Sequence, residues 1–198
     1  MWGAQEIFKE QPSSVDGIWN RQDYRALDGF ICAISPFNFT SIGGNLPTAP
    51  AIVGNVAVWK PSRTAVLSNY YYMKLLQWCG LPGGVINFVP CSGSDMSQYV
   101  VSHPKMAGFH FTGSTAVFQS VWKQVGENIA SYSNYPRLVG ETGGKDFIFA
   151  HATADIEPLA AAIVRGSFEF QGQKCSACSR AFVPESIWPQ VEALLKKH

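Results

Sequence analysis

The sequence has little charge and no long apolar run, and both absences restrict what the protein can bind. Its 15 basic and 14 acidic residues leave a formal net charge of +1, so no strong field attracts nucleic acid or an anionic membrane. No apolar run approaches the ~20 residues of a membrane-spanning helix, and residues 1–25 lack the basic start and apolar core of a secretory signal. We therefore expect a soluble intracellular protein whose partner is a small molecule, with no nucleic-acid or membrane partner.

Cysteine is also scarce and is scattered along the chain. There are 5 cysteines in 198 residues, and the 46% of apolar residues can bury a core without covalent cross-links. An odd number of dispersed cysteines favours free thiols in a reducing compartment over a disulfide framework. The five are Cys32, Cys79, Cys91, Cys175 and Cys178.

From Gly29 onward, short apolar runs rich in valine, isoleucine and phenylalanine alternate with longer helix-like segments. This alternation is typical of βαβ units around an open parallel sheet, so the predicted fold class is α/β. The predicted strands are 29–35, 56–60, 85–89 and 106–111, and the predicted helices between them are 41–53, 65–79 and 95–102.

The second half of the chain continues the pattern. It contains a helix-like stretch from Ser114 to about Tyr132, strand-like runs at 137–141 and within 143–150, a helix at 155–170 with Asp155 as N-cap, a strand-like run at 180–184, and a last helix opened by Ser186. An α/β domain rarely ends on such a helix, so we expect a partial sequence. The polar N-terminal segment carries no clear pattern, and we predict no structure for it.

The decamer QGQKCSACSR (171–180) contains two cysteines with CxxC spacing, Cys175 and Cys178. A zinc site would need a second ligand pair, and no histidine lies near these cysteines in the sequence. A thioredoxin-like pair would follow a strand at a helix N-terminus, whereas a helix is predicted just before this pair. A metal ligand and a redox cysteine are therefore disfavoured. The two main alternatives for Cys175 are an ordinary buried thiol, or a nucleophile that needs a base or a neighbouring cation and a group to hold an oxyanion.

Two other residues have side chains suited to such chemistry. Glu141 stands among apolar and glycine residues in VGETGGKDF, where desolvation would make its carboxylate a stronger base. Asn38 follows the first predicted strand, at the carboxyl end of the sheet, where an amide can donate to a developing oxyanion. Each residue also has an ordinary alternative, as a surface carboxylate at a strand end or as a turn or cap residue.

Two further stretches are suited to a dinucleotide. Lys60 and Ser62 follow the second predicted strand, where an ammonium and a hydroxyl can meet ribose hydroxyls or a phosphate. Gly113 and Ser114 lie at a strand-to-helix turn, where free backbone N–H groups and the helix dipole favour a pyrophosphate. The GxGxxG fingerprint is absent, and each stretch alone is weak evidence.

Taken together and in order, PFNF, KPS, FTGS, ETGGK and GQKCSACSR resemble the NAD(P)-dependent aldehyde dehydrogenase superfamily. The resemblance runs from about Trp19 to the end of the chain. The details PSSVDGIWNRQDYR, PFNFT, GNLPTAP and GQKCSACSR are most similar to its pyrroline-5-carboxylate dehydrogenase branch. That branch oxidises L-glutamate γ-semialdehyde to glutamate in proline breakdown, with NAD as the cofactor.

The resemblance implies a role for each of these residues. It makes Cys175 the nucleophile, Glu141 the general base, and Asn38 with the Cys175 backbone N–H the oxyanion hole, and it leaves Cys178 as a packed bystander. It places Phe39, Lys174 and Ser176 around the semialdehyde. The residues it assigns to the cofactor are Ser35, Pro36, Lys60, Ser62, Gly93, Gly113 and Ser114.

The resemblance also implies the domain organisation. It divides the chain into an N-terminal segment at 1–28, a Rossmann-like NAD-binding domain at 29–139, and the start of a second α/β catalytic domain at 140–198. The family's later Glu-x-Phe-Gly-Pro segment, substrate-carboxylate loop and C-terminal oligomerisation strand are not found in these 198 residues. Phe118 and Thr142 stand where many relatives have glycine and leucine.

Two other functions stay open beside the oxidation of L-glutamate γ-semialdehyde. One is a nucleotide-binding module without turnover, and the other is the same chemistry on another aldehyde. The resemblance further implies homo-oligomers for full-length relatives, and a location in the mitochondrial matrix for a eukaryotic protein or in the cytoplasm for a bacterial one.

Overall fold

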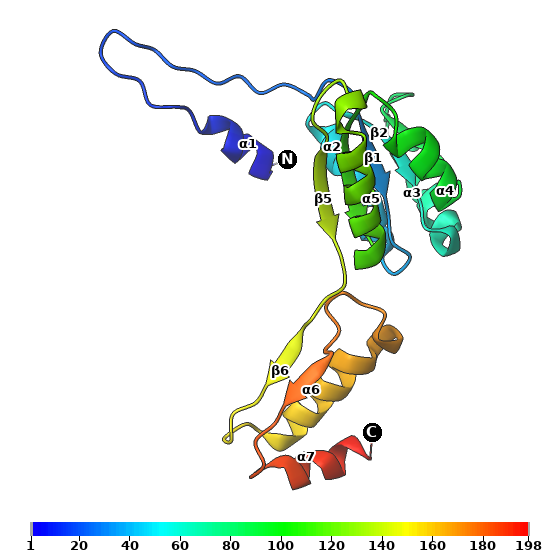
Figure 1. The fold of residues 1–198 in the computed structure, drawn as a ribbon. Helices are drawn as coiled ribbons and strands as arrows, with labels where there is room; N and C mark the ends of the chain where they lie inside the picture. Colours follow the sequence, from blue (N-terminus) through cyan, green and yellow to red (C-terminus); the bar gives the residue numbers. More distant parts are fainter. Residues whose placement is uncertain (1, 198) are drawn as a thin grey trace. The chain divides into compact units, whose positions relative to one another are not determined.

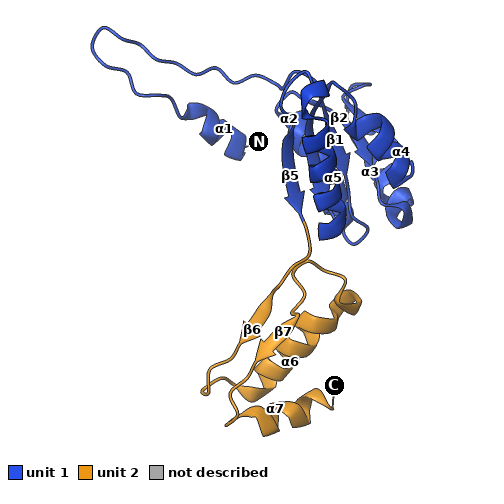
Figure 2. Cartoon of the chain, in the orientation of Figure 1, with its two compact units in different colours: residues 1–141 blue, residues 142–198 orange. Residues whose placement is uncertain are grey.

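The computed structural model of the chain describes residues 2–197. It separates into two compact units, which we call unit 1 (residues 1–141) and unit 2 (residues 142–198) (Figure 1, Figure 2). No helix in the described part of the chain has the length and apolar character needed to cross a membrane.

Unit 1 is built around a five-stranded sheet in the order β3-β2-β1-β4-β5, and every neighbouring pair is parallel. The strands are β1 (Phe30–Ile34), β2 (Val56–Lys60), β3 (Ile86–Phe88), β4 (Met106–Thr112) and β5 (Arg137–Glu141). The chain moves outward from β1 through β2 to β3 and then returns to the other side of β1 to form β4. The strand order therefore reverses between β1 and β4.

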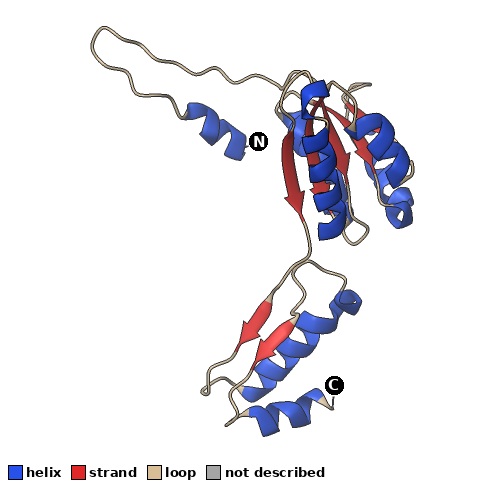
Figure 3. Cartoon of the chain, viewed as in Figure 1, coloured by secondary structure: helices blue, strands red, loops and turns tan. Residues whose placement is uncertain are grey.

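The helices of unit 1 bury both faces of this sheet (Figure 3). Successive side chains of a strand point to opposite faces. Accordingly, Cys32 belongs to one core cluster with Met96 and Val121, whereas Ala33 belongs to another with Leu46 and Trp59. The helices are α2 (Thr40–Ile52), α3 (Val66–Trp78), α4 (Gly93–Asp95) and α5 (Thr115–Glu127), with 3-10 turns at Arg63–Ala65 and Ile129–Ser131.

The segment predicted as a helix at 95–102 has a different geometry. After the single turn of α4, residues Met96–Val101 form a π-helical turn. Gln124 of α5 stabilises the wider turn. Its side-chain amide donates to the Ser97 carbonyl at 2.9 Å and to the Ser102 hydroxyl at 2.7 Å. The Ser102 hydroxyl also donates to the Ser97 carbonyl at 3.2 Å.

Unit 2 contains a two-stranded parallel sheet covered by helices. Its elements are β6 (Phe147–Phe149), α6 (Ile156–Phe168), a 3-10 segment (Glu169–Gly172), β7 (Arg180–Phe182) and α7 (Trp188–Leu195). Its core consists of Ala150, Leu159, Ile163, Ile187 and Val191. Phe147 and Phe149 project away from this core and are exposed.

The N-terminal part of unit 1, for which we predicted no structure, contains helix α1 (Trp2–Lys9). A long loop follows, and its two sides are joined by Gln11 and Gln22, whose backbone and side-chain groups exchange hydrogen bonds of 3.0 and 3.2 Å. The rings of Phe8 and Tyr24 stack with centroids 4.8 Å apart.

The predicted α/β class and parallel sheet are confirmed, with most element boundaries within two residues. The helix expected to reach Tyr132 ends at Glu127, and the last helix begins at Trp188 rather than Ser186. Pro189 lies in the first turn of that last helix, where its missing N–H costs no helical hydrogen bond. Asp155 is the N-cap residue of α6 by position, without a side-chain capping bond.

Candidate active site and nucleotide edge

The carboxyl ends of the five parallel strands lie along one edge of the sheet in unit 1. The register makes these ends level, because Ile34 pairs with both Lys60 and Phe111, and Thr112 pairs with Glu141. Nearly all residues predicted for chemistry in unit 1 follow or end these strands: Ser35, Pro36, Asn38, Phe39, Lys60, Ser62, Gly93, Gly113, Ser114 and Glu141. We call this edge of unit 1 the nucleotide edge.

The nucleotide edge includes the point where the strand order reverses. In open α/β sheets, ligands bind outside the carboxyl ends of the strands at such a reversal. Ser35 and Pro36 follow β1 on one side of it, and Gly113 follows β4 on the other. Both Ser35 and Pro36 are buried. The Ser35 hydroxyl accepts a hydrogen bond of 2.9 Å from the indole N–H of Trp59, so this side chain supports the edge from inside.

The turn between β4 and α5 is held at both of its ends. The Gly113 N–H donates to the Glu141 carbonyl at 3.1 Å, which fixes the turn to β5. The Ser114 side chain caps α5 by accepting from the Val117 N–H at 3.4 Å. A side chain at position 113 would lie 2.6 Å from the Phe111 ring, so the turn needs glycine. The backbone N–H groups of the first turn of α5 thus stand at the nucleotide edge, where an anion is favoured.

Phe118, noted above as a departure from the family pattern, has a structural partner. Its ring stacks on that of Phe111 with centroids 5.7 Å apart. A Cβ atom at Gly140 of β5 would overlap the Phe118 ring, so the glycine provides the space that the aromatic side chain fills. The departure is therefore accommodated within unit 1.

At the nucleotide edge, residues that follow β2 and β3 line a pocket of about 240 Å³. Its lining is Pro61, Arg63, Val66, Pro90, Cys91 and Ser92. Lys60 precedes this lining, is half-buried, and donates to the Pro61 carbonyl at 3.2 Å. Burial raises the pKa of the Cys91 thiol, and the nearby Lys60 ammonium opposes the shift. Sequence reasoning identified Lys60 and Ser62 here but missed Arg63, although Arg63 directly follows the KPS motif.

Glu141 ends β5, and its side chain is exposed. The sequence left two interpretations of this carboxylate open, and in unit 1 it is an exposed carboxylate at a strand end rather than a desolvated one. The reason is topological, because β5 is an edge strand and Val139, Gly140 and Glu141 are all exposed. The backbone of Glu141 is nevertheless fixed, since its carbonyl accepts the bond from Gly113.

Cys175 lies in a tight loop of unit 2 and is half-buried. The loop contains a turn closed by a 3.2 Å bond from the Ala177 N–H to the Lys174 carbonyl, with Cys175 as the first central residue. Within the described residues, no hydrogen bond engages the Cys175 backbone N–H. This N–H is therefore available to donate a hydrogen bond to an oxyanion.

Within unit 2, Gly144 of the ETGGK motif contacts the GQKCSACSR motif. A Cβ atom at Gly144 would overlap the Cys175 carbonyl oxygen, so the two backbones pass in close contact. After the turn, the loop is fixed by a bond from the Cys178 N–H to the Gly166 carbonyl (2.8 Å) and by one from the Ser179 N–H to the Asp146 carbonyl (3.0 Å). Sequence reasoning missed the contact at Gly144, because no local pattern indicates it.

The remaining predicted residues also have defined environments. Cys178 is half-buried, and its thiol donates to the Arg180 carbonyl at 3.2 Å. Lys174 pairs with Glu169 at 2.5 Å, and Ser176 is exposed. Asn38 and Phe39 are half-buried at the nucleotide edge. All five cysteines are free thiols, and the described residues contain no cluster of three or more histidine, cysteine or acidic side chains able to hold a metal ion.

The predicted catalytic residues come from both units. Asn38 and Glu141 belong to unit 1, whereas Cys175, Lys174 and Ser176 belong to unit 2. In the prediction, the base and an oxyanion donor thus belong to unit 1, and the nucleophile belongs to unit 2.

Comparison with known proteins identifies relatives of this chain. The chain is 52% identical over 192 residues to the mitochondrial delta-1-pyrroline-5-carboxylate dehydrogenase of Dictyostelium discoideum, covering 96% of this chain and 34% of that protein. It is 49% identical to the human protein of the same name, covering 98% of this chain and 35% of that protein. The chain thus spans about a third of the length of these relatives.

Solved structures give the same result. The delta-pyrroline-5-carboxylate dehydrogenase from Mycobacterium tuberculosis, in a crystal structure with bound NAD, matches with a TM-score of 0.92 and 56% identity, over 98% of this chain and 36% of that one. A 1-pyrroline-5-carboxylate dehydrogenase from Thermus with bound NAD matches with a TM-score of 0.74 and 29% identity, over 90% of this chain and 36% of that one. The model of the aldehyde dehydrogenase family matches residues 3–198. The chain therefore belongs to the aldehyde dehydrogenase family.

Proposed function

We propose that this chain carries the nucleotide-binding part and the nucleophile of an NAD-dependent dehydrogenase that oxidises L-glutamate γ-semialdehyde to glutamate in proline breakdown. The observation that carries the proposal is the match, at 56% identity over 98% of the chain, to a pyrroline-5-carboxylate dehydrogenase whose crystal structure contains NAD. The names of several eukaryotic relatives place them in mitochondria, which is consistent with an intracellular role.

Three features of unit 1 fit a dinucleotide. Lys60 offers an ammonium at the nucleotide edge, next to a pocket between β2 and β3. The capped N-terminus of α5 offers backbone N–H groups to a pyrophosphate. Third, the reversal of strand order between β1 and β4 marks the position at which such ligands bind. Ser62 and Gly93 are sequence neighbours of residues that line the pocket, and neither has a large side chain.

We assign the parts of the chain accordingly. Residues 29–139 form the NAD-binding domain, residues 1–28 an N-terminal segment, and residues 140–198 the beginning of the catalytic domain. The division into two compact units at Glu141 supports this assignment to within two residues.

In the proposed reaction Cys175 forms two successive intermediates. Its thiolate attacks the aldehyde carbon, and the C=O electrons move onto oxygen to give a thiohemiacetal oxyanion. The Asn38 amide and the Cys175 backbone N–H donate to that oxygen. NAD, when bound, supplies the hydride acceptor that converts the thiohemiacetal to a thioester. Glu141 then takes a proton from a water molecule, which attacks the thioester carbon and releases the carboxylate product and the thiol.

The substrate is proposed to lie among Phe39, Lys174 and Ser176. L-Glutamate γ-semialdehyde carries a carboxylate, and the Lys174 ammonium next to the nucleophile offers a charge-assisted hydrogen bond to such a group. The Phe39 ring supplies an apolar wall for the methylene groups. This set of side chains favours an acidic aldehyde over a neutral one.

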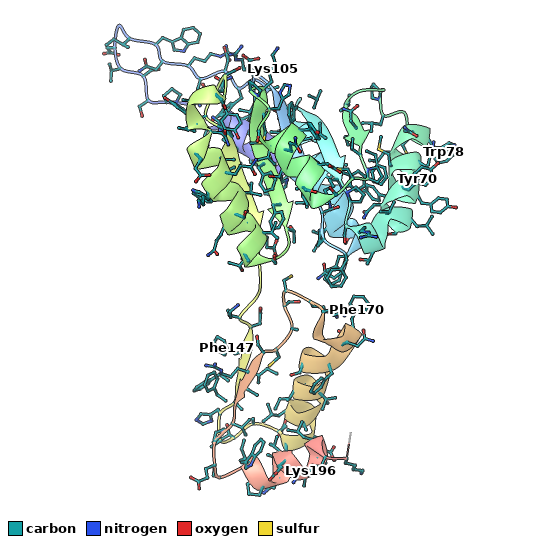
Figure 4. All side chains as sticks on the ribbon, turned by 45° about the vertical axis from the view of Figure 1, so that its right-hand side comes forward. Tyr70, Trp78, Lys105, Phe147, Phe170 and Lys196 are labelled. Carbon is teal, nitrogen blue, oxygen red and sulfur yellow. The ribbon has the colours of Figure 1, made fainter. Side chains whose placement is uncertain are left out.

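The cofactor part of the proposal can be tested directly by titrating the chain with NAD in a calorimeter. Lys60→Ala removes a charge-assisted contact, which typically weakens binding about tenfold or more. Lys105→Ala is the matched control, because this lysine precedes β4 and so lies at the opposite edge of the sheet (Figure 4). Equal affinities of the two variants, or no NAD binding by the folded chain at millimolar concentration, would contradict the proposed nucleotide edge.

A further inference from the structure

The backbone just before Cys175 has an uncommon conformation. Phe170 (φ 53°, ψ 40°) and Gln171 (φ 53°, ψ 31°) lie in the left-handed region, and Gly172 follows with φ 68°. In the described chain, Phe170 and Gln171 are the two residues other than glycine with a positive φ. L-residues avoid this region, and such residues persist where the surrounding structure holds them. We call residues 170–172 the left-handed turn; Figure 4 shows Phe170 at its start, at the end of α6.

An ion pair joins the two sides of the left-handed turn. Glu169 precedes the turn, and its Oε2 atom lies 2.5 Å from Nζ of Lys174, which follows it. The other carboxylate oxygen of Glu169 lies 3.8 Å from the Arg165 guanidinium, one helical turn earlier in α6. The side chain of Lys174 is only 23% exposed, whereas the cation of each other ion pair in residues 2–197 is more than 60% exposed. This pair is therefore more enclosed than the others.

The ion pair complements the hydrogen bonds on the far side of the cysteine loop. Downstream of Cys175, the Cys178 and Ser179 N–H groups bond to carbonyls of Gly166 and Asp146. Upstream, a 3.0 Å bond from the Gln173 N–H to the Phe170 carbonyl closes the left-handed turn, and the Glu169 carboxylate holds Lys174. The hydrogen bond to Lys174 lowers the pKa of Glu169, as expected for a carboxylate that stays ionised in the pair.

We propose that Glu169 is a positioning residue: its carboxylate holds Lys174 and so fixes the left-handed turn that presents the thiol and backbone N–H of Cys175. The inference rests on the proposed function, in which Cys175 is the nucleophile. Lys174 then meets an acidic substrate with its ammonium already oriented by Glu169, which does not itself touch the substrate.

The test measures backbone hydrogen exchange and alkylation of the 198-residue chain. Glu169→Gln removes the charge and keeps the size of the side chain, and Glu157→Gln is the control, because Glu157 is an exposed glutamate in the first turn of α6. The Glu169 side chain is still 48% exposed, and an ion pair with such access to water has modest strength. Exchange of the peptide 170–176 should therefore rise about two- to fivefold in Glu169→Gln. Exchange of residues 159–165 should not change.

The ratio of alkylation by iodoacetamide at two cysteines of unit 2 supplies a second measurement, because a general loss of stability in unit 2 would not change this ratio. In Glu169→Gln we expect the ratio of labelling at Cys175 to labelling at Cys178 to rise at least about twofold, because the turn is freed and the unpaired Lys174 ammonium favours the thiolate. The charge-reversed double variant Glu169→Lys with Lys174→Glu should restore the slow exchange of residues 170–176.

The outcomes distinguish failure of the positioning role from failure of the proposed function. Unchanged exchange and labelling in Glu169→Gln would overturn the positioning role, and so would a change that the double variant does not reverse. Faster exchange throughout α6 would overturn it as well, because it would indicate loss of overall stability in unit 2. A wild-type chain in which Cys175 is no more reactive than Cys178 would instead contradict the proposed function.

Discussion

Replacing Gly144 with alanine tests the close contact between Gly144 and the backbone of Cys175 in unit 2. The added Cβ atom would overlap the Cys175 carbonyl oxygen and lie 2.7 Å from the Cys175 carbonyl carbon and 2.8 Å from an Asp146 carboxylate oxygen. A side-chain rotation cannot relieve overlap with a backbone carbonyl, so one of the two segments must move. Overpacking of this kind costs about 1–3 kcal/mol, which corresponds to roughly a 5- to 150-fold shift in an opening equilibrium.

Hydrogen exchange measured by mass spectrometry checks this value. Amides of α6 should exchange roughly 5- to 150-fold faster in Gly144→Ala, because their protection depends on the opening of unit 2. Gly126→Ala is the control, since an added Cβ atom in α5 would meet nothing within 4 Å, and it should stabilise that helix by up to about 1 kcal/mol. Wild-type exchange rates in Gly144→Ala would refute the close contact.

Two further predictions concern a half-buried histidine and a buried cysteine of unit 1. Burial lowers the pKa of His110, and its 3.0 Å hydrogen bond to the Leu46 carbonyl opposes the shift only in part. The folded state therefore binds fewer protons than the unfolded state below the usual histidine pKa of about 6.5, so the free energy of unfolding should fall as the pH drops from 7.5 to 5.5. Denaturant melts of the wild type and His110→Gln check this, and an equal pH dependence in both would contradict it. Cys32 is fully buried, and desolvation strongly raises the pKa of its thiol; it should resist iodoacetamide in the folded chain while the exposed Cys79 is labelled, and early labelling of Cys32 would disprove the burial.

The parallel sheet could be predicted because its signals are local. The strands β1, β2 and β4 are short apolar runs bounded by turn residues, and the helices between them end at glycine or proline signals. The π-helical turn at Met96–Val101 could not be predicted, since it depends on Gln124 from a helix far along the sequence. The sequence could not decide between an exposed and a desolvated Glu141 for a similar reason, because the position of β5 at the sheet edge follows from strand order and not from its own residues.

The candidate site shows the same limit. Motif order predicts Lys60, Gly113 and Cys175 as site positions, since each stands in a short stretch with characteristic neighbours. It did not reveal the ion pair of Glu169 with Lys174, because phenylalanine and glutamine at 170 and 171 give no sign of a left-handed turn. Conformations that the surroundings impose on ordinary residues cannot be recognised from their sequence alone.

The hydrogen bond between Trp59 and Ser35 gives the nucleotide edge an optical reporter. Of the six tryptophans, Trp59 has no exposed surface, whereas the other five are at least 41% exposed: Trp2, Trp19, Trp78, Trp122 and Trp188. A collisional quencher such as iodide therefore suppresses the fluorescence of those five and leaves emission from Trp59. Because the indole bonds to the residue directly after β1, the remaining signal reads the state of the edge at which strand order reverses, without any added label.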